Sequence, residues 1–110
     1  MADGIAVLYR WRLHPGREEA FREAWKAITL ALRSERGSWG SRLHRAEDGT
    51  YWAYARWPDR ETLMSSRGLP SVDVDASRTM QDCISESFDD VLLVPTDDAL
   101  AEPPPPSPRT

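Results

Sequence analysis

The chain has 110 residues, five tryptophans and a formal net charge of −4, which predicts one small domain that buries only about 60–65% of its unfolded surface and would gain stability from a second copy. The negative charge argues against a sequence-independent nucleic-acid binder, and no apolar run approaches the roughly 20 residues of a membrane span. Since no leader sequence is visible and the single cysteine, Cys83, precludes an internal disulfide, we expect a cytoplasmic protein without a membrane or nucleic-acid partner.

Residues 5–14 alternate between two faces in the manner of a β-strand. The odd positions are apolar, whereas the even positions end in two arginines and His14. The Pro-Gly pair that follows ends the strand, because proline cannot donate a ladder hydrogen bond and glycine permits the turn. Such different faces predict that the strand lies between two different environments.

Residues 17–33 are predicted to form an amphipathic helix. Glu18 and Glu19 lie in its first turn, where the helix dipole favours anions, and Gly37 is a stop signal. The apolar side chains recur at helical spacing and form one stripe, which consists of Phe21, Ala24, Trp25, Ile28 and Leu32.

Residues 39–46 and 51–57 are predicted to pair as a hairpin, because Asp48-Gly49 is a strong signal for a two-residue loop. The pairing that follows joins His44 with Ala53, Arg42 with Ala55, Gly40 with Trp57, Leu43 with Tyr54 and Arg45 with Trp52. A loop longer by one residue would exchange the faces of one strand relative to the other.

The second half of the domain is predicted to contain two helical segments and a last strand. Asp59 is a suitable N-cap for a short helix through Leu63 and Met64. After a Gly-Leu-Pro-Ser break, residues 75–86 form another helix, and residues 90–95 form the strand. The inward side chains of the longer helix are expected to be Ala76, Met80, Cys83, Ile84 and, as a further candidate, Phe88.

This order of elements defines one domain over residues 1–96, followed by a tail over 97–110. The tail has five prolines and no apolar pattern, which predicts disorder. The order βαββαβ, with the second helical region in two parts, is typical of the ferredoxin-like α+β fold. Such a sheet has helices on one face only, so the bare face is expected to meet a partner.

Three stretches, RWRLHPGREEAF, DGT and YARWPDRETL, occur in an order that resembles the antibiotic biosynthesis monooxygenase family over roughly residues 5–95. The resemblance implies a dimeric α+β barrel, a homodimer in which the bare sheet faces of two copies meet. Each copy then keeps a pocket between its sheet and its helices or partner, and the face that carries Trp57 lies inside this pocket.

The predicted hairpin register would bring four further side chains into this pocket, namely His44, Arg42, Tyr9 and Trp11. The opposite face would then pack against the helices through Leu8, Leu43, Trp52 and Tyr54. The alternation alone also allows the reverse, with Trp11 and Leu13 under the helix.

Four residues are candidates for binding an aromatic substrate. Trp57 resembles the family's pocket tryptophan and can stack on a flat molecule, but it suits a core position equally well. Tyr9 and Trp11 would form an aromatic wall, or else belong to the sheet core or the dimer interface. Arg78 resembles the family's occasional helix arginine near the pocket, although a solvated helix face is the simpler setting.

His44 and Arg42 are the candidate catalytic residues. His44 titrates near neutral pH and can act as a general base for a phenolic or enolic proton; without an assignable carboxylate partner, it also fits an exposed edge strand. Arg42 can hold a developing enolate or phenolate oxygen, or pair with a carboxylate at the surface.

The sequence also departs from the family's pattern. Quinone-forming members tend to carry an asparagine where this chain has Ala53 and a tyrosine where it has Leu63. The haem-degrading branch has an asparagine at the position of Tyr9 and a histidine in the region of residues 59–88, which contain none, so haem oxygenation is disfavoured. Neither histidine has metal-ligand neighbours, and no phosphate-binding glycine loop occurs, so we expect no metal and no cofactor.

These observations predict a cofactor-independent monooxygenase, or a relative of one, that acts on a small aromatic substrate of the phenol or anthrone type. The alternative is a non-catalytic dimeric barrel that binds a small ligand or a partner, which the loss of both family polar residues favours. A purely structural subunit is the third possibility, and a pocket filled by Trp11 and Trp57 would support it.

Overall fold

The computed structural model describes residues 4–101. In chain order the elements are β1 (Ile5–Leu13), α1 (Glu18–Glu35), β2 (Ser41–Arg45), β3 (Tyr51–Trp57), α2 (Arg60–Arg67), α3 (Val74–Cys83), β4 (Ile84–Ser87) and β5 (Val91–Leu93). Residues 97–101 belong to no helix or strand. The remainder of the predicted tail, 102–110, lies outside the described residues.

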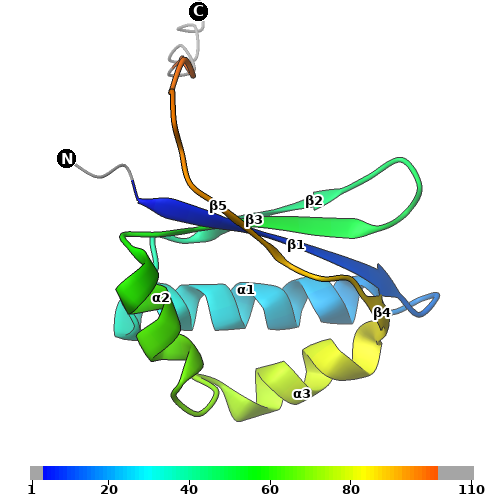
Figure 1. Cartoon of the computed structure of the whole chain (residues 1–110). Helices are drawn as coiled ribbons and strands as arrows, with labels where there is room; N and C mark the ends of the chain where they lie inside the picture. The colour runs from blue at the N-terminus through cyan, green and yellow to red at the C-terminus, as the bar shows by residue number, and fades with distance from the viewer. Residues whose placement is uncertain (1–3, 102–110) are drawn as a thin grey trace, which may run out of the picture.

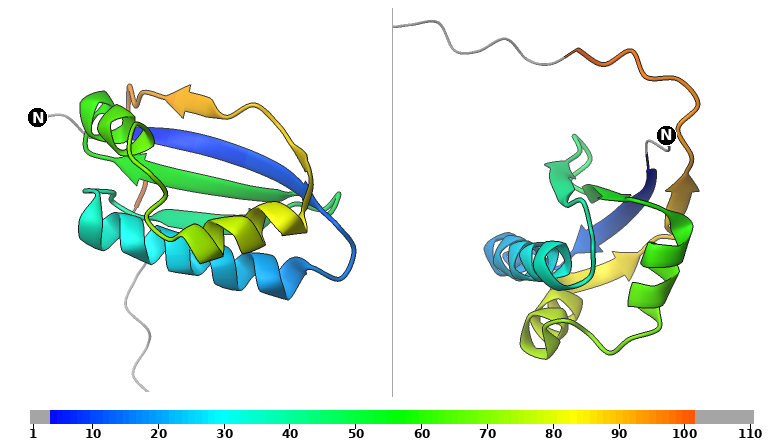
Figure 2. Two further views of the ribbon diagram at one scale, coloured as in Figure 1. Left: turned by 90° about the horizontal axis from the view of Figure 1, so that it is seen from below. Right: turned by 90° about the vertical axis from the view of Figure 1, so that its left-hand side faces the viewer.

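The strands form one antiparallel sheet in the order β2-β3-β1-β4, and β5 also pairs with β1. β4 pairs with Trp11–Leu13 and β5 with Ala6–Leu8, so the two short strands share one edge of β1. All three helices lie on the same side of this sheet (Figures 1 and 2). The ferredoxin-like α+β fold predicted from the sequence is therefore confirmed.

The second helical region forms largely as predicted, apart from its end. The Asp59 side chain accepts a hydrogen bond from the Thr62 backbone N–H at 2.7 Å and so caps α2. The helix predicted over 75–86 ends at Cys83 instead, and the following residues are extended as β4. The open edge of β1 captures them, because the His14 backbone N–H donates to the Cys83 carbonyl at 2.8 Å. Tertiary pairing therefore overrides the helical spacing of the sequence.

The predicted hairpin register is wrong by one residue. The Ala46 backbone N–H donates to the Thr50 carbonyl at 2.8 Å, and the Gly49 N–H donates back to Ala46 at 3.0 Å. Gly49 has a φ of 86°, as expected in a three-residue loop that ends in a left-handed glycine. Asp48 fixes this loop by accepting hydrogen bonds from the Thr50 backbone N–H and hydroxyl.

The extra loop residue shifts the register by one, which exchanges the two faces of β2 relative to those of β3. The observed pairs are Ser41 with Ala55, Arg42 with Tyr54, Leu43 with Ala53, His44 with Trp52 and Arg45 with Tyr51. Leu43 packs against the helix-side core as predicted. Trp52 and Tyr54 lie on the opposite face, and so does Leu8, which pairs with Tyr54; their predicted packing against the helices is wrong.

The core lies between the sheet and the helices in two clusters. One consists of Val7, Trp57 and Leu63, and the other of Phe21, Tyr51 and Cys83. The odd residues of β1 face this core, so the reverse arrangement, with Trp11 and Leu13 on the helix side, is the one the chain adopts.

The face without helices is aromatic and basic. The Arg10 guanidinium lies 4.2 Å from the Phe88 ring centroid and 5.0 Å from that of Trp52, and it pairs with Asp48 at 3.4 Å. The helical spacing suggested Phe88 as a further inward side chain, but Phe88 lies on the face without helices and this suggestion is wrong. Tyr54 on the same face is 41% exposed, which leaves a large aromatic ring uncovered in the single chain.

Candidate functional site

A hollow of about 570 Å³ lies between the helices and the sheet beside Trp11. β1, α1, α3 and β4 all contribute to its wall, which consists of Trp11, Ile28, Ser77, Met80, Gln81, Ile84, Ser85, Glu86 and Ser87. Its volume falls within the range of small-molecule sites, about 300–1,000 Å³. The apolar members of the wall are only half-buried although they lie on the helix side.

Trp11 is the largest side chain in this wall, and neighbouring rings hold it in place. It stacks on Tyr9 with ring centroids 5.6 Å apart and an interplanar angle of 5°. Phe21 meets it edge-on at 5.3 Å and in turn contacts Tyr51 at 5.7 Å. An indole fixed in this way can stack on a flat aromatic molecule without first losing conformational freedom.

A charged cluster adjoins the aromatic wall at Tyr9. Arg67, in the last turn of α2, donates to the Tyr9 hydroxyl at 3.2 Å and to the Asp90 carboxylate at 2.7 Å. Partial burial alone would lower the pKa of Arg67, but these two partners outweigh it and raise the pKa above its usual value. A permanent positive charge is thus held at the phenolic oxygen beside the hollow.

Arg67 and Asp90 are not among the site residues predicted from the sequence. Arg67 lies 58 positions from Tyr9 along the chain, and Asp90 lies 23 positions from Arg67. No local pattern links positions so far apart. Only the orientation of Tyr9 toward the helices could have pointed to α2 as the source of a partner.

Trp57 was predicted to lie either in the substrate pocket or in the core, and it lies in the core. It is 4% exposed and packs against Val7 and Leu63. Ala53 and Leu63, which replace the family's asparagine and tyrosine, are 0% and 1% exposed. This end of the helix side is therefore filled with apolar side chains.

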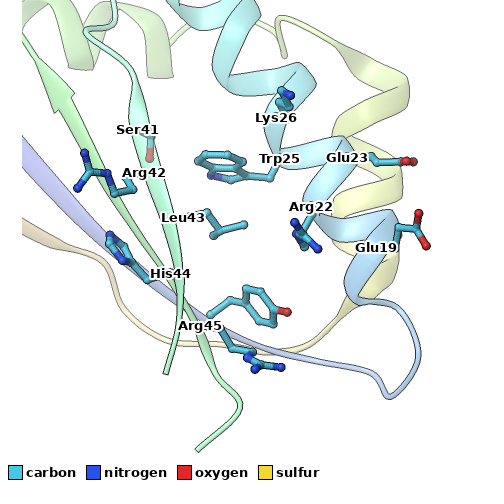
Figure 3. A pocket seen from close by; sticks show the side chains of 11 residues that line it. Glu19, Arg22, Glu23, Trp25, Lys26, Ser41, Arg42, Leu43, His44 and Arg45 are labelled. Atoms are coloured by element: carbon cyan, nitrogen blue, oxygen red, sulfur yellow. The ribbon is translucent and has the colours of Figure 1, made fainter. Parts of the chain in front are cut away.

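His44 and Arg42 do not share a pocket with Trp57 and Trp11, so this predicted constellation is wrong. Both side chains are exposed and lie on the face of β2 away from the core (Figure 3). The reversed register causes this, because it places Ser41, Leu43 and Arg45 on the helix side instead. Arg78 is exposed on α3, as a solvated helix face requires.

His44 and Arg42 instead line a second and larger hollow, an open groove of about 840 Å³ between α1 and β2 (Figure 3). Trp25, Leu43 and Tyr51 form its apolar floor, and charged side chains from both elements surround it.

Two further observations concern the described part of the chain. Within residues 4–101, no three His, Cys, Asp or Glu side chains gather as they would around a metal ion. None of the helices in this range has both the length and the apolar character needed to cross a membrane.

The comparisons with known proteins agree with the fold. The family model described as antibiotic biosynthesis monooxygenase matches residues 4–73. Rv0793 from Mycobacterium tuberculosis is similar in structure, with a TM-score of 0.70, 23% identity, and coverage of 89% of this chain and 100% of that one. SnoaB from Streptomyces nogalater, described as a cofactor-independent oxygenase, has a TM-score of 0.73 and 17% identity, with 89% and 98% covered. No curated protein matches the sequence.

Proposed function

Since the chain belongs to the antibiotic biosynthesis monooxygenase family, we propose that it is a cofactor-independent monooxygenase-like protein that acts on a small aromatic substrate of the phenol or anthrone type. The observation that carries the proposal is the hollow beside Trp11. The Trp11 indole stacks on Tyr9, which lies outside the lining of the hollow and whose hydroxyl accepts a hydrogen bond from Arg67. The structural similarity to SnoaB supports the same class of activity.

The proposed reaction balances without a redox cofactor. An anthrone CH₂ group loses a proton, and the resulting electron-rich anion reduces dioxygen and forms a carbon–oxygen bond. Cleavage of the O–O bond then leaves one oxygen atom as the product carbonyl and the other as water, which takes up both protons of the CH₂ group. All four electrons come from the substrate, so the task of the protein is to bind it and to stabilise its anion.

The side chains around the hollow suit that task. Trp11 would stack on the substrate ring, and Arg67, together with the Tyr9 hydroxyl, would hold the developing anion. A charged donor already in place stabilises such an oxyanion without reorganisation during the reaction. We do not assign this role to His44 or Arg42, because their side chains lie on the other face of the sheet.

The experiment that tests the proposal is oxygen consumption with anthrone and with a dihydroxynaphthalene. We expect the protein to exceed the rate of the protein-free control, and Arg67→Gln to lower kcat by about tenfold or more, as loss of an oxyanion donor does. Arg78→Gln is the matched control, since it removes an exposed arginine from α3. Oxygen uptake equal to the protein-free control would contradict the proposal.

We further propose that the chain forms a homodimer through the face without helices. The uncovered Tyr54 ring and the Arg10 cluster lie on this face, and burial in a dimer would remove the aromatic surface from water. Sedimentation should show a dimer, and Tyr54→Glu should shift it toward the monomer. A wild-type monomer at high concentration would contradict this proposal.

Binding without turnover remains the second candidate, and a specific observation favours it. Ala53 and Leu63 are fully buried where quinone-forming members tend to carry polar residues, so these two positions offer no group for catalysis. Saturable binding of anthrone, with oxygen uptake equal to the control, would support this alternative.

A further inference from the structure

We propose that the groove between α1 and β2 is a second ligand site, separate from the hollow at Trp11, and that it takes a flat aromatic anion such as an aryl carboxylate. This inference does not depend on the proposed monooxygenase activity. It follows from the charges, the floor and one unpaired hydroxyl of the groove, considered in turn below.

The groove is positively charged in a chain whose net charge is −4. Three cations, Arg22, Lys26 and Arg45, and two carboxylates, Glu19 and Glu23, surround its floor, whereas the Arg42 side chain points away from it (Figure 3). Among the described residues, the ion pairs join Arg10 with Asp48, Arg12 with Glu86, and Arg67 with Asp90. None of these pairs engages a cation of the groove, so its positive charges are available to a ligand.

The floor of the groove suits a flat ring. Trp25 extends from α1 toward β2, with Leu43 beside it (Figure 3), and Tyr51 completes the floor. Trp25 is half-buried, whereas Tyr51 is buried. One part of the indole is therefore anchored in the core while another part stays open for stacking, with cations at the rim.

An unpaired hydroxyl lies at the same place. Ser41 Oγ is buried and has no hydrogen-bond partner, and Ser41 is part of the groove wall beside Trp25 (Figure 3). A buried polar group without a partner is unfavourable. Rotation of the Ser41 side chain toward the groove would let a ligand carboxylate accept from this hydroxyl, and the nearby cations would favour the same carboxylate.

The size of the groove favours a small molecule over a peptide. Its volume of about 840 Å³ falls within the usual range for small-molecule sites, about 300–1,000 Å³. β2 is also the edge strand of the sheet, so an acidic segment of another protein chain that pairs with this edge is the competing occupant, and the experiment must distinguish the two.

The test is calorimetric titration with 2-naphthoate and with 2-naphthalenemethanol, which has the same ring and no charge. We expect naphthoate to bind and the neutral alcohol to bind about tenfold more weakly, since each exposed ion pair contributes up to about fivefold and the carboxylate has more than one cation near it. In an amide and indole NMR spectrum, naphthoate should shift the signals of Trp25 and Ser41 and leave that of Trp11 in place.

The variant Arg22→Gln/Arg45→Gln should weaken naphthoate binding by about tenfold, because it removes two of the exposed charges. Arg60→Gln/Arg78→Gln is the matched control, since it removes two exposed arginines outside the groove and should bind as the wild type does.

Three results would overturn the proposal. These are equal affinity for the acid and the alcohol, shifts confined to Trp11, and binding of an acidic peptide at Trp25 without binding of naphthoate. The titrations measure binding alone, so an absence of oxygen uptake would leave this site unaffected.

Discussion

The two ends of the helix side of the sheet show how one alternating strand can build both a core and a cavity. At the Trp57 end, Val7, Trp57 and Leu63 are each at most 4% exposed. At the Trp11 end, Trp11, Met80 and Ile84 stay half-buried around a hollow of about 570 Å³. The odd residues of β1 contribute side chains to both ends, so the difference lies in how the helix residues pack against them.

α2 closes one end, because its capped first turn directs Leu63 onto Trp57 and Val7. At the other end, α3 stops at Cys83 and the chain continues as β4 along β1. Two polar residues of β4, Ser85 and Ser87, line the hollow without filling it. An early helix end thus leaves space where a longer helix would have packed.

The largest expected effect compares one apolar truncation at each end. Leu63→Ala removes a side chain that is 1% exposed and should lower the free energy of unfolding by about 2–5 kcal/mol. Met80→Ala borders the hollow and should cost about half as much, since it loses less buried contact. Urea unfolding of both variants measures the contrast, and equal losses would mean that the two ends are packed alike.

Ala53→Asn tests whether the buried middle of β3, between the two ends, can accept the asparagine that quinone-forming members tend to carry. Ala53 is 0% exposed, so the larger amide would be buried without a partner, at a cost of about 2–4 kcal/mol. We expect a lower midpoint in urea and no gain in oxygen uptake. A variant of unchanged stability that gains turnover would show that the middle of β3 can open into a pocket.

Trp11→Leu tests the open end with a smaller expected effect. It keeps an apolar side chain and removes the stacking surface, so binding of an aromatic substrate should weaken by up to about tenfold. Trp39→Leu is the control, because Trp39 is 48% exposed and lies outside this hollow. If both variants bind anthrone equally well, the hollow at Trp11 is not the substrate site.

The elements that the sequence predicts well depend on local chemistry. Local patterns of a few residues predicted the alternation of β1 and β3, the apolar stripe of α1 and the Asp59 cap. The chain order of these elements was then sufficient to predict the ferredoxin-like topology.

The candidate site was predicted less well, because it depends on small or distant choices. Asp48-Gly49 fits either a two-residue or a three-residue loop, and the observed choice moved His44 and Arg42 to the other face. Arg67, the partner of Tyr9, comes from α2, and Asp90, the partner of Arg67, comes from the segment between β4 and β5. No spacing in the sequence reveals a contact of that range.

The smallest expected effect concerns two carboxylates, Asp59 at the packed end and Asp48 in the hairpin that adjoins Tyr51. Bonds from the Thr62 backbone and side chain lower the pKa of Asp59 below its usual 3.8, and bonds from the Thr50 side chain and backbone do the same for Asp48. A pKa that is lower in the folded state means that the charged form stabilises the fold. This contribution is complete above the unfolded pKa of 3.8 and is lost as the pH falls through the folded values.

Asp59→Asn should therefore flatten the acid dependence of stability below about pH 4, because asparagine can still cap the helix but cannot titrate. The amide signals of Thr62 and Thr50 report the two carboxylates separately, and in this variant only the Thr50 signal should still titrate. If the free energy of unfolding of the variant falls below about pH 4 as steeply as that of the wild type, the α2 cap does not contribute to the acid sensitivity of the packed end. The titration of Asp48 at the hairpin would then be the first place to look for it.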